Sequence, residues 1–192
     1  MAKNEPHGGA KTLGDLHRDH KTFAELLDVF ARELDVLDVG GMPDLELIDG
    51  IARYFADYAN GHHHPKENLI YGHLICHRPT YGEEVFQLLK EHEQMARAMA
   101  ELMVVLEAFS RVDPSSRRKL SEEGRAFLNR ERDHMRREEE KFFPAAEGCL
   151  IDSQWDEVER DQRQSFLRLT AGRDFSEAIR RIRQRALTPT RT

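Results

Sequence analysis

His63-His64-Pro65-Lys66-Glu67 is one of two stretches that place a histidine four residues before a glutamate; the other is His134-Met135-Arg136-Arg137-Glu138. On a helix this spacing puts both side chains on one face, one turn apart. An imidazole and a carboxylate arranged in this way can bind one cation, or two cations if the carboxylate bridges them. Because a single pair of this kind is common in charged helices, its meaning depends on the residues that precede it.

A single histidine precedes each pair at nearly the same distance. His20 stands 43 residues before His63, and His92 stands 42 residues before His134. The chain therefore contains one module twice, offset by 71–72 residues. An aromatic residue also follows each glutamate at the same distance, as Tyr71 in the first module and as Phe142 in the second. This repetition of order and spacing indicates one shared site rather than separate solvent-exposed pairs.

Length and composition limit the function classes. The 192 residues suffice for one compact domain with a buried core, and 39% apolar with 33% charged residues is typical of amphipathic helices. A net charge of −6 argues against nucleic acid, and no apolar run is long enough to span a membrane. Two cysteines form neither a disulfide framework nor a zinc finger, and the N-terminus lacks a signal-peptide pattern. We expect a cytoplasmic protein without nucleic-acid or membrane partners.

Apolar residues recur at helical spacing in four long segments. These segments cover about residues 12–38, 44–76, 81–109 and 116–146. Glycine or proline separates them, and Asp44 is a suitable N-cap for the second. No stretch alternates with period two over the length of a strand. The pattern predicts an all-α fold, an up-down-up-down four-helix bundle.

Three parts of the chain are predicted. Residues 1–11 are polar and are expected to be disordered. Residues 12–147 form the bundle, and residues 148–192 form an extension with two shorter helices, at about 153–164 and 175–186. Pro65 is expected to kink or loosen the second long helix beside His63, because proline removes a backbone donor.

In such a bundle each helix contributes one face to a shared core, so the paired residues meet. The candidate ligands comprise four imidazoles and two carboxylates: His20, His63, Glu67, His92, His134 and Glu138. An unpaired ion in a core costs several kcal/mol. A metal removes this cost, because it binds the unprotonated imidazoles and the ionised carboxylates. Two metals, each with two histidines and both bridged by the two glutamates, would satisfy every group. Mixed imidazole and carboxylate ligands suit iron or manganese, whereas structural zinc more often has cysteine.

Neighbouring residues leave alternatives open. His17 lies one turn before His20, where it would either orient His20 by a hydrogen bond or act as a further ligand. Glu139 competes with Glu138 as the bridging group, because the helix register could favour either residue.

Other histidines are expected to lie outside the site. His62 and His64 flank His63 at steps of about 100°, so they should face outward or support the ligands. His73 and His77 lie beyond the site and form no convincing metal spacing with Cys76.

The order of these motifs resembles the hemerythrin-like, or HHE cation-binding, domain. The HHPKE stretch at 63–67 is similar to a variant of bacterial members, and Leu16-His17-Arg18-Asp19-His20 resembles the first-helix signature of the family. The resemblance covers about residues 12–147. It implies a non-haem centre of two iron ions, joined by an oxide or hydroxide and held by the six candidate ligands, with Glu67 and Glu138 as bridges. Zinc or manganese would be found in some preparations.

The resemblance also implies a function. Family members bind oxygen, nitric oxide or peroxides, sense them, or handle iron. Invertebrate oxygen carriers have a histidine four residues before the third-helix ligand, where this chain has Leu88. We therefore expect a protein that binds or senses a small oxidant, with a peroxide-consuming oxidoreductase or a metal-storage module as alternatives. The sequence leaves open whether the chain is an enzyme and whether it forms a homodimer.

Overall fold

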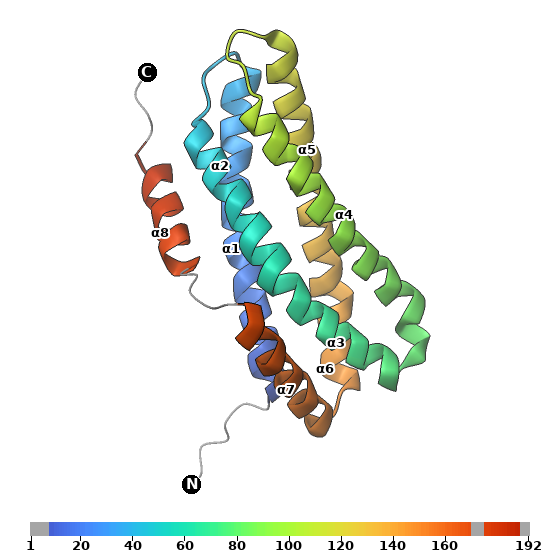
Figure 1. Cartoon of the computed structure of the whole chain (residues 1–192). Coiled ribbons are helices and arrows are strands. Elements are labelled where there is room, and N and C mark those ends of the chain that lie inside the picture. Colours follow the sequence, from blue (N-terminus) through green and yellow to red (C-terminus); the bar gives the residue numbers. More distant parts are fainter. Residues whose placement is uncertain (1–7, 170–174, 189–192) are drawn as a thin grey trace.

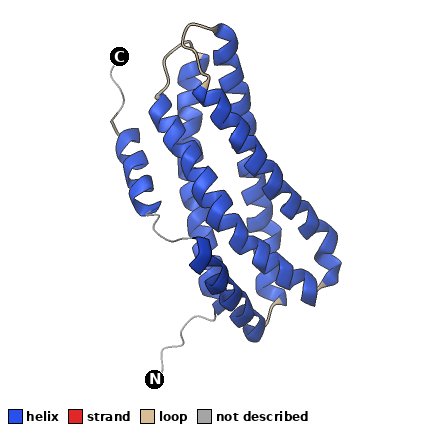
Figure 2. Ribbon diagram, in the orientation of Figure 1, coloured by secondary structure: helices blue, strands red, loops and turns tan. Residues whose placement is uncertain are grey.

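The computed structural model describes residues 8–169 and 175–188, and these residues are helical throughout except for short turns (Figure 2). The α-helices are α1 (Gly8–Asp38), α2 (Leu45–Tyr54), α3 (His64–His77), α4 (Gly82–Glu107), α5 (Pro114–Arg137), α6 (Phe143–Cys149), α7 (Asp152–Leu169) and α8 (Phe175–Ala186). Two π-helices, η1 (Phe55–His63) and η3 (Glu138–Phe142), and a 3-10 turn, η2 (Pro79–Tyr81), connect some of them. The described part of the chain contains no strand, so the prediction of an all-α fold is confirmed.

Four long rods lie side by side and form a helical bundle (Figure 1). They are α1, the continuous segment α2–η1–α3, α4, and the continuous segment α5–η3–α6. Asp44 caps the second rod as predicted, because its Oδ1 accepts a hydrogen bond of 3.0 Å from the Leu47 N–H. At the end of α1, Gly40 has a φ of 86°, a conformation that glycine adopts without steric cost.

The predicted apolar stripe of the first rod is buried. Its eight leucines and phenylalanines are at most 4% exposed: Leu13, Leu16, Phe23, Leu26, Leu27, Phe30, Leu34 and Leu37. The central part of this stripe packs into the main core with residues of α2, α4 and α5. Burial of such side chains contributes about 1.5–3 kcal/mol each, so this stripe is a main source of stability for the bundle.

Two rods change locally to π-helix just before a proline. η1 ends at His63, two residues before Pro65, and η3 ends at Phe142, two residues before Pro144. Proline has no N–H group and disturbs the preceding turn, so a π-helical register costs less there than elsewhere. The predicted loosening beside His63 is confirmed.

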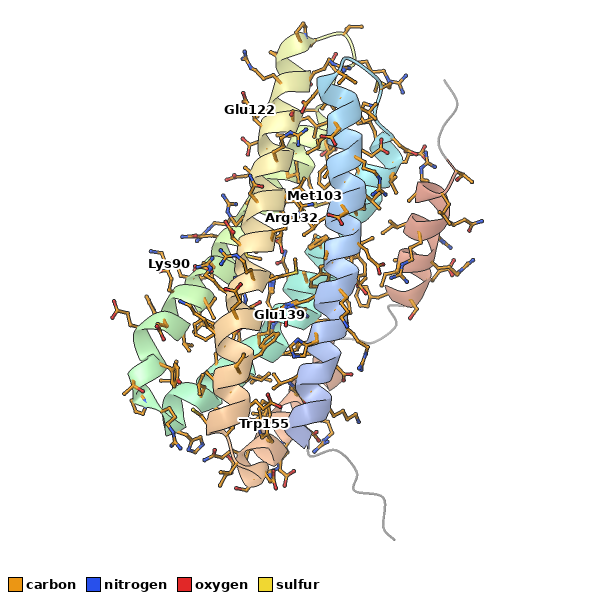
Figure 3. All side chains as sticks on the ribbon, turned by 180° about the vertical axis from the view of Figure 1, so that it is seen from behind. Lys90, Met103, Glu122, Arg132, Glu139 and Trp155 are labelled. Carbon is orange, nitrogen blue, oxygen red and sulfur yellow. The ribbon has the colours of Figure 1, made fainter. Side chains whose placement is uncertain are left out.

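The first rod begins earlier than predicted. Residues 8–11 belong to α1, so the expectation that they are disordered is wrong, while residues 1–7 lie outside the described part. The reason is contact with the C-terminal extension. A Cβ atom at Gly9 would lie 2.5 Å from the Trp155 ring, which means that the glycine backbone packs closely against α7. Figure 3 shows Trp155 near this end of α1.

The C-terminal extension consists of two helices on the outside of the bundle. α7 packs against α1 and α3, and α8 packs against α2 (Figure 1). The predicted bounds of α8 agree with the structure, whereas α7 is longer than predicted. None of the described helices is long and apolar enough to cross a membrane.

Candidate metal centre

The six predicted ligands come from all four rods and meet in the interior. His20 lies in α1, His63 ends η1, and Glu67 occupies the first turn of α3. His92 lies in α4, while the last pair comes from α5 and η3. The exposed fraction is at most 6% for each member: His20, His63, Glu67, His92, His134 and Glu138. The structure thus brings together every residue of the repeated motif.

The histidines form two pairs around the two glutamates. His20 and His63 make the first pair, with ring centroids 4.9 Å apart. The Nε2 atom of His63 lies 3.0 Å from Glu67 Oε1, and that of His20 lies 3.5 Å from the same oxygen. His20 Nε2 is also 3.4 Å from Glu138 Oε2. Both rings of this pair therefore direct Nε2 toward one oxygen of a glutamate.

The second pair has the same relation to the opposite oxygens. The Nε2 atoms of His92 and His134 are 2.8 Å apart. His92 Nε2 lies 3.5 Å from Glu67 Oε2 and 3.5 Å from Glu138 Oε1. His134 Nε2 lies 3.1 Å from Glu138 Oε1. Each glutamate thus turns one oxygen to the first pair and the other oxygen to the second pair.

Although these atoms lie close together, several of them are not in hydrogen-bonding geometry. Among the described residues, six buried side-chain nitrogen or oxygen atoms lack a hydrogen-bond partner, and five belong to this cluster: His20 Nε2, His63 Nε2, both oxygens of Glu67, and Glu138 Oε2. An unsatisfied buried polar atom costs about 1–3 kcal/mol. Because all five atoms can donate a lone pair, a bound cation would satisfy them together, and the residues fit a metal.

The family comparison agrees with this geometry. The family model described as hemerythrin HHE cation binding domain matches residues 12–146. The chain belongs to this hemerythrin family. No curated protein and no solved structure matches the chain. The family assignment confirms the resemblance found in the sequence and implies cation binding, and the buried histidine and glutamate cluster could hold the cation.

In each of the four candidate-ligand histidines, the outer nitrogen is Nδ1, which points away from the two glutamates. Each Nδ1 has a partner on another helical segment. His63 Nδ1 lies 3.1 Å from Asp19 Oδ2, and His92 Nδ1 lies 2.7 Å from Asn68 Oδ1. For the other two histidines, His20 Nδ1 lies 2.8 Å from Glu139 Oε1, and His134 Nδ1 lies 3.1 Å from Glu91 Oε2. An acceptor at Nδ1 holds the proton there and leaves Nε2 free to bind a cation.

Glu139 and His17 belong to the layer of side chains around the candidate ligands. Glu139 uses Oε1 for His20 Nδ1 and places Oε2 2.7 Å from His17 Nδ1. Figure 3 shows Glu139 on the side where α1 and η3 lie next to each other. Glu139 thus contacts the nitrogen of His20 that points away from the glutamate pair, whereas Glu138 contacts the nitrogen that points toward it.

Without a metal, protons balance the charges of the cluster. Burial lowers the pKa of His20, but the carboxylates of Glu138, Glu139 and Glu67 outweigh it and raise that pKa to about 12. Burial likewise opposes protonation of His134, whose pKa Glu138 raises to about 10. Although burial would raise it, the pKa of Glu138 lies well below its ordinary value because His134 and other imidazoles contact it. The metal-free centre therefore holds ionised glutamates beside protonated histidines.

Two histidines that were expected to face outward are buried. His62 is 5% and His64 is 4% exposed, so the alternative that they face outward is wrong, while a role in supporting the ligands stays open. The ring of His62 lies under the α8 residue Phe175, with centroids 4.8 Å apart. The ring of His64 lies beside His92, with centroids 4.2 Å apart and planes within 9°. The partner elements α4 and α8 are remote in sequence, so helical spacing around His63 carried no signal for either contact.

His64 adds a nitrogen to the second histidine pair. One donor atom from each of His64, Glu67, His92 and His134 lies within 4.8 Å of the others. The pKa of His64 lies well below its ordinary value because of burial and the nearby imidazoles, so its ring is neutral. Leu88, one turn before His92, instead packs in an apolar cluster with Tyr71 and Phe142. A residue from another rod thus places a further imidazole beside His92.

We predict that cation binding displaces protons even at alkaline pH. At pH 8 an ordinary histidine, with a pKa of about 6.5, is already neutral. His20 and His134, with pKa values of about 12 and about 10, still hold their protons at that pH. Binding of Zn²⁺ to metal-free protein at pH 8 should therefore release about two protons per chain. Calorimetry in buffers of different ionisation enthalpy measures this number, and a release close to zero would contradict the charge balance described above.

Proposed function

We propose that the chain is a non-haem di-iron protein with the up-down-up-down hemerythrin bundle, and that it binds or senses a small oxidant such as oxygen, nitric oxide or peroxide. The observation that supports a two-ion centre is the division of each glutamate between two histidine pairs. Glu67 directs Oε1 to His63 and Oε2 to His92, and Glu138 divides its oxygens in the same way. One cation beside each pair would make both glutamates bridging ligands.

The donor set favours iron. Four imidazoles and two carboxylates converge. The combination suits iron or manganese, and zinc can also occupy it. Bound iron would supply a change of oxidation state and coordination positions for the oxidant. The protein would fix the ligands through their outer partners, so that the site keeps its shape when the oxidation state changes.

The apolar packing beneath a surface pocket supports a small ligand at the centre. The pocket has a volume of about 440 Å³, and its lining includes Leu88, Phe142, Arg137 and Lys141. Leu88 and Phe142 pack with Tyr71, whose hydroxyl donates a hydrogen bond of 2.5 Å to Glu138 Oε1. An apolar layer therefore separates the pocket from the centre, which would hinder large or charged substrates more than small uncharged molecules.

The bridging roles can be tested by substitution. Glu67→Ala or Glu138→Ala should lower the iron content from about two ions per chain to about one or fewer, because each removes an oxygen ligand from both ions. The melting temperature should fall as well, since metal binding contributes to folding. Elemental analysis of protein from iron-replete cells and thermal unfolding measure the two effects.

Glu139→Ala is the matched control for the bridging test, because Glu139 contacts only the outer nitrogens of His17 and His20. This variant should keep both ions with weaker affinity. Full iron content and an unchanged melting temperature in the Glu67 and Glu138 variants would rule out the bridging roles.

We also propose that His64 is the third imidazole of the second ion. His64→Ala should weaken binding of one of the two ions by roughly tenfold or more, the size expected when a group that supports a metal is lost. His62→Ala is a matched control, since His62 is adjacent and equally buried but contacts Phe175 and Tyr58. Metal content after dialysis against a graded series of chelator concentrations compares the two variants. Equal retention of metal in both would exclude His64 as a ligand.

A second candidate function, peroxide reduction, is favoured by two proton-bearing groups near the centre. Reduction of hydrogen peroxide to water consumes two protons and two electrons. The Tyr71 hydroxyl contacts Glu138, and burial raises the pKa of Glu131 to about 7, so its carboxyl holds a proton near neutral pH. Glu131 is 3% exposed and lies one turn before His134. These groups could supply protons, whereas a pure sensor needs no such supply.

If the centre turns over peroxide, Tyr71→Phe should lower steady-state peroxide consumption by about tenfold or more while leaving the iron content unchanged, because only the hydroxyl is removed. The assay uses iron-loaded protein with a chemical reductant. If the unaltered protein consumes peroxide no faster than free iron does, the enzymatic function is excluded and the binding or sensing function remains.

A further inference from the structure

Four side chains on α3 and α7 form a second cluster with metal-binding chemistry. His73 and His77 lie one turn apart on α3, and Glu157 and Asp161 lie one turn apart on α7. The two helices pack against each other. None of the four residues belongs to the buried centre. In the sequence, His73, His77 and Cys76 do not have a spacing typical of metal ligands. The fold, however, places beside the two histidines two carboxylates that lie 80 to 88 residues away in the sequence.

The distances fit a cation better than a hydrogen-bonded network. His73 Nδ1 lies 3.8 Å from Glu157 Oε2, which is too long for a hydrogen bond. One donor atom from each of His73, His77 and Glu157 lies within 4.8 Å of the others. Ligands of a tetrahedral zinc ion, with bonds of about 2.1 Å, are roughly 3.4 Å apart. The distances between these donor atoms would need to shorten by at most roughly 1.4 Å to reach this geometry.

The remaining carboxylate orients one of the histidines. Asp161 Oδ2 lies 3.1 Å from His73 Nε2, the nitrogen opposite to the one that faces Glu157. A carboxylate at the far nitrogen holds the proton there and directs the other nitrogen toward a metal. His73 is 17% exposed and Glu157 is 48% exposed, so solvent can supply a fourth ligand.

We propose that this cluster is a second cation site, specific for Zn²⁺ or a similar first-row ion, that fastens α7 to α3. His73 Nδ1, His77 and Glu157 are the protein ligands, Asp161 orients His73, and water completes the coordination. Two imidazoles and one carboxylate are a frequent zinc ligand set. The site is independent of the proposed di-iron function, because it shares no residue with the buried centre.

Zinc at this site would strengthen the attachment of α7 to the bundle. α7 is held on the bundle by Trp155 and Val158, which pack with residues including Leu16 and Phe143. The ring of Phe143 in turn stacks on His20, with centroids 5.3 Å apart. Zinc would therefore stabilise the packing of α7 next to the wall of the buried centre.

The test is a zinc titration of the full-length protein after the buried centre has been loaded with iron. The unaltered protein should bind one further Zn²⁺, and His77→Ala and Glu157→Gln should each weaken this binding at least tenfold. Asp156→Asn, a change of an exposed neighbour on α7, is the matched control and should bind zinc as the unaltered protein does. Calorimetry gives the affinities, and circular dichroism verifies that each variant is folded.

Trp155, the single tryptophan of the chain, gives a second readout. Zinc should raise the urea concentration at which Trp155 becomes exposed in the unaltered protein and in Asp156→Asn, but not in Glu157→Gln. Equal zinc affinity in all proteins would overturn the proposal, and so would loss of binding in His77→Ala alone, since α7 would then supply no ligand. Binding of one Zn²⁺ with the same affinity by the Glu138→Ala protein would show that the second site exists even if the di-iron proposal fails.

Discussion

The fold depends on the burial of ionisable groups whose charges must balance one another, through protons or a bound cation. Four imidazoles and two carboxylates lie in the interior, each at most 6% exposed, and five of their atoms have no hydrogen-bond partner. Removing one partner from such a cluster would leave an uncompensated charge in a medium of low dielectric constant, which costs about 3–5 kcal/mol. All four rods therefore present these side chains at one level of the bundle.

The π-helical segments make this alignment compatible with the rest of the core. η1 ends at His63 and η3 begins at Glu138, so each deviation lies at a ligand. A π-helical turn shifts the side chains that follow it relative to a regular helix. Three consecutive histidines, His62 to His64, are consequently all buried, and each meets a different helix. A regular amphipathic face could not bury all three.

A layer of carboxylates and an amide surrounds the centre and sets its chemistry. Asp19, Asn68, Glu91 and Glu139 each hold one outer nitrogen, so every ring directs Nε2 inward. Glu91 is itself paired with Arg137, which links this layer to the lining of the surface pocket. The apolar layer made by Leu88, Tyr71 and Phe142 then limits which molecules can approach. The same fold therefore orients the imidazoles and places apolar side chains beside them.

The sequence by itself determined the all-helical class, the approximate extent of the four rods and the six residues that meet at the centre. Helical periodicity and i, i+4 spacing are local properties, and the repeated module placed one ligand set on each rod. Local spacing could not decide between Glu138 and Glu139, because adjacent residues differ by only about 100° around a helix. The packing of α1 against η3 decides which of them faces the other glutamate, since Glu139 contacts the outer nitrogen of His20 and Glu138 the inner one. The burial of His64 and the pairing of His73 with Asp161 also required tertiary structure, because their partners lie 28 and 88 residues away on other helices. Contacts between remote segments depend on how the helices pack, and packing is a property of the whole core rather than of any one stretch.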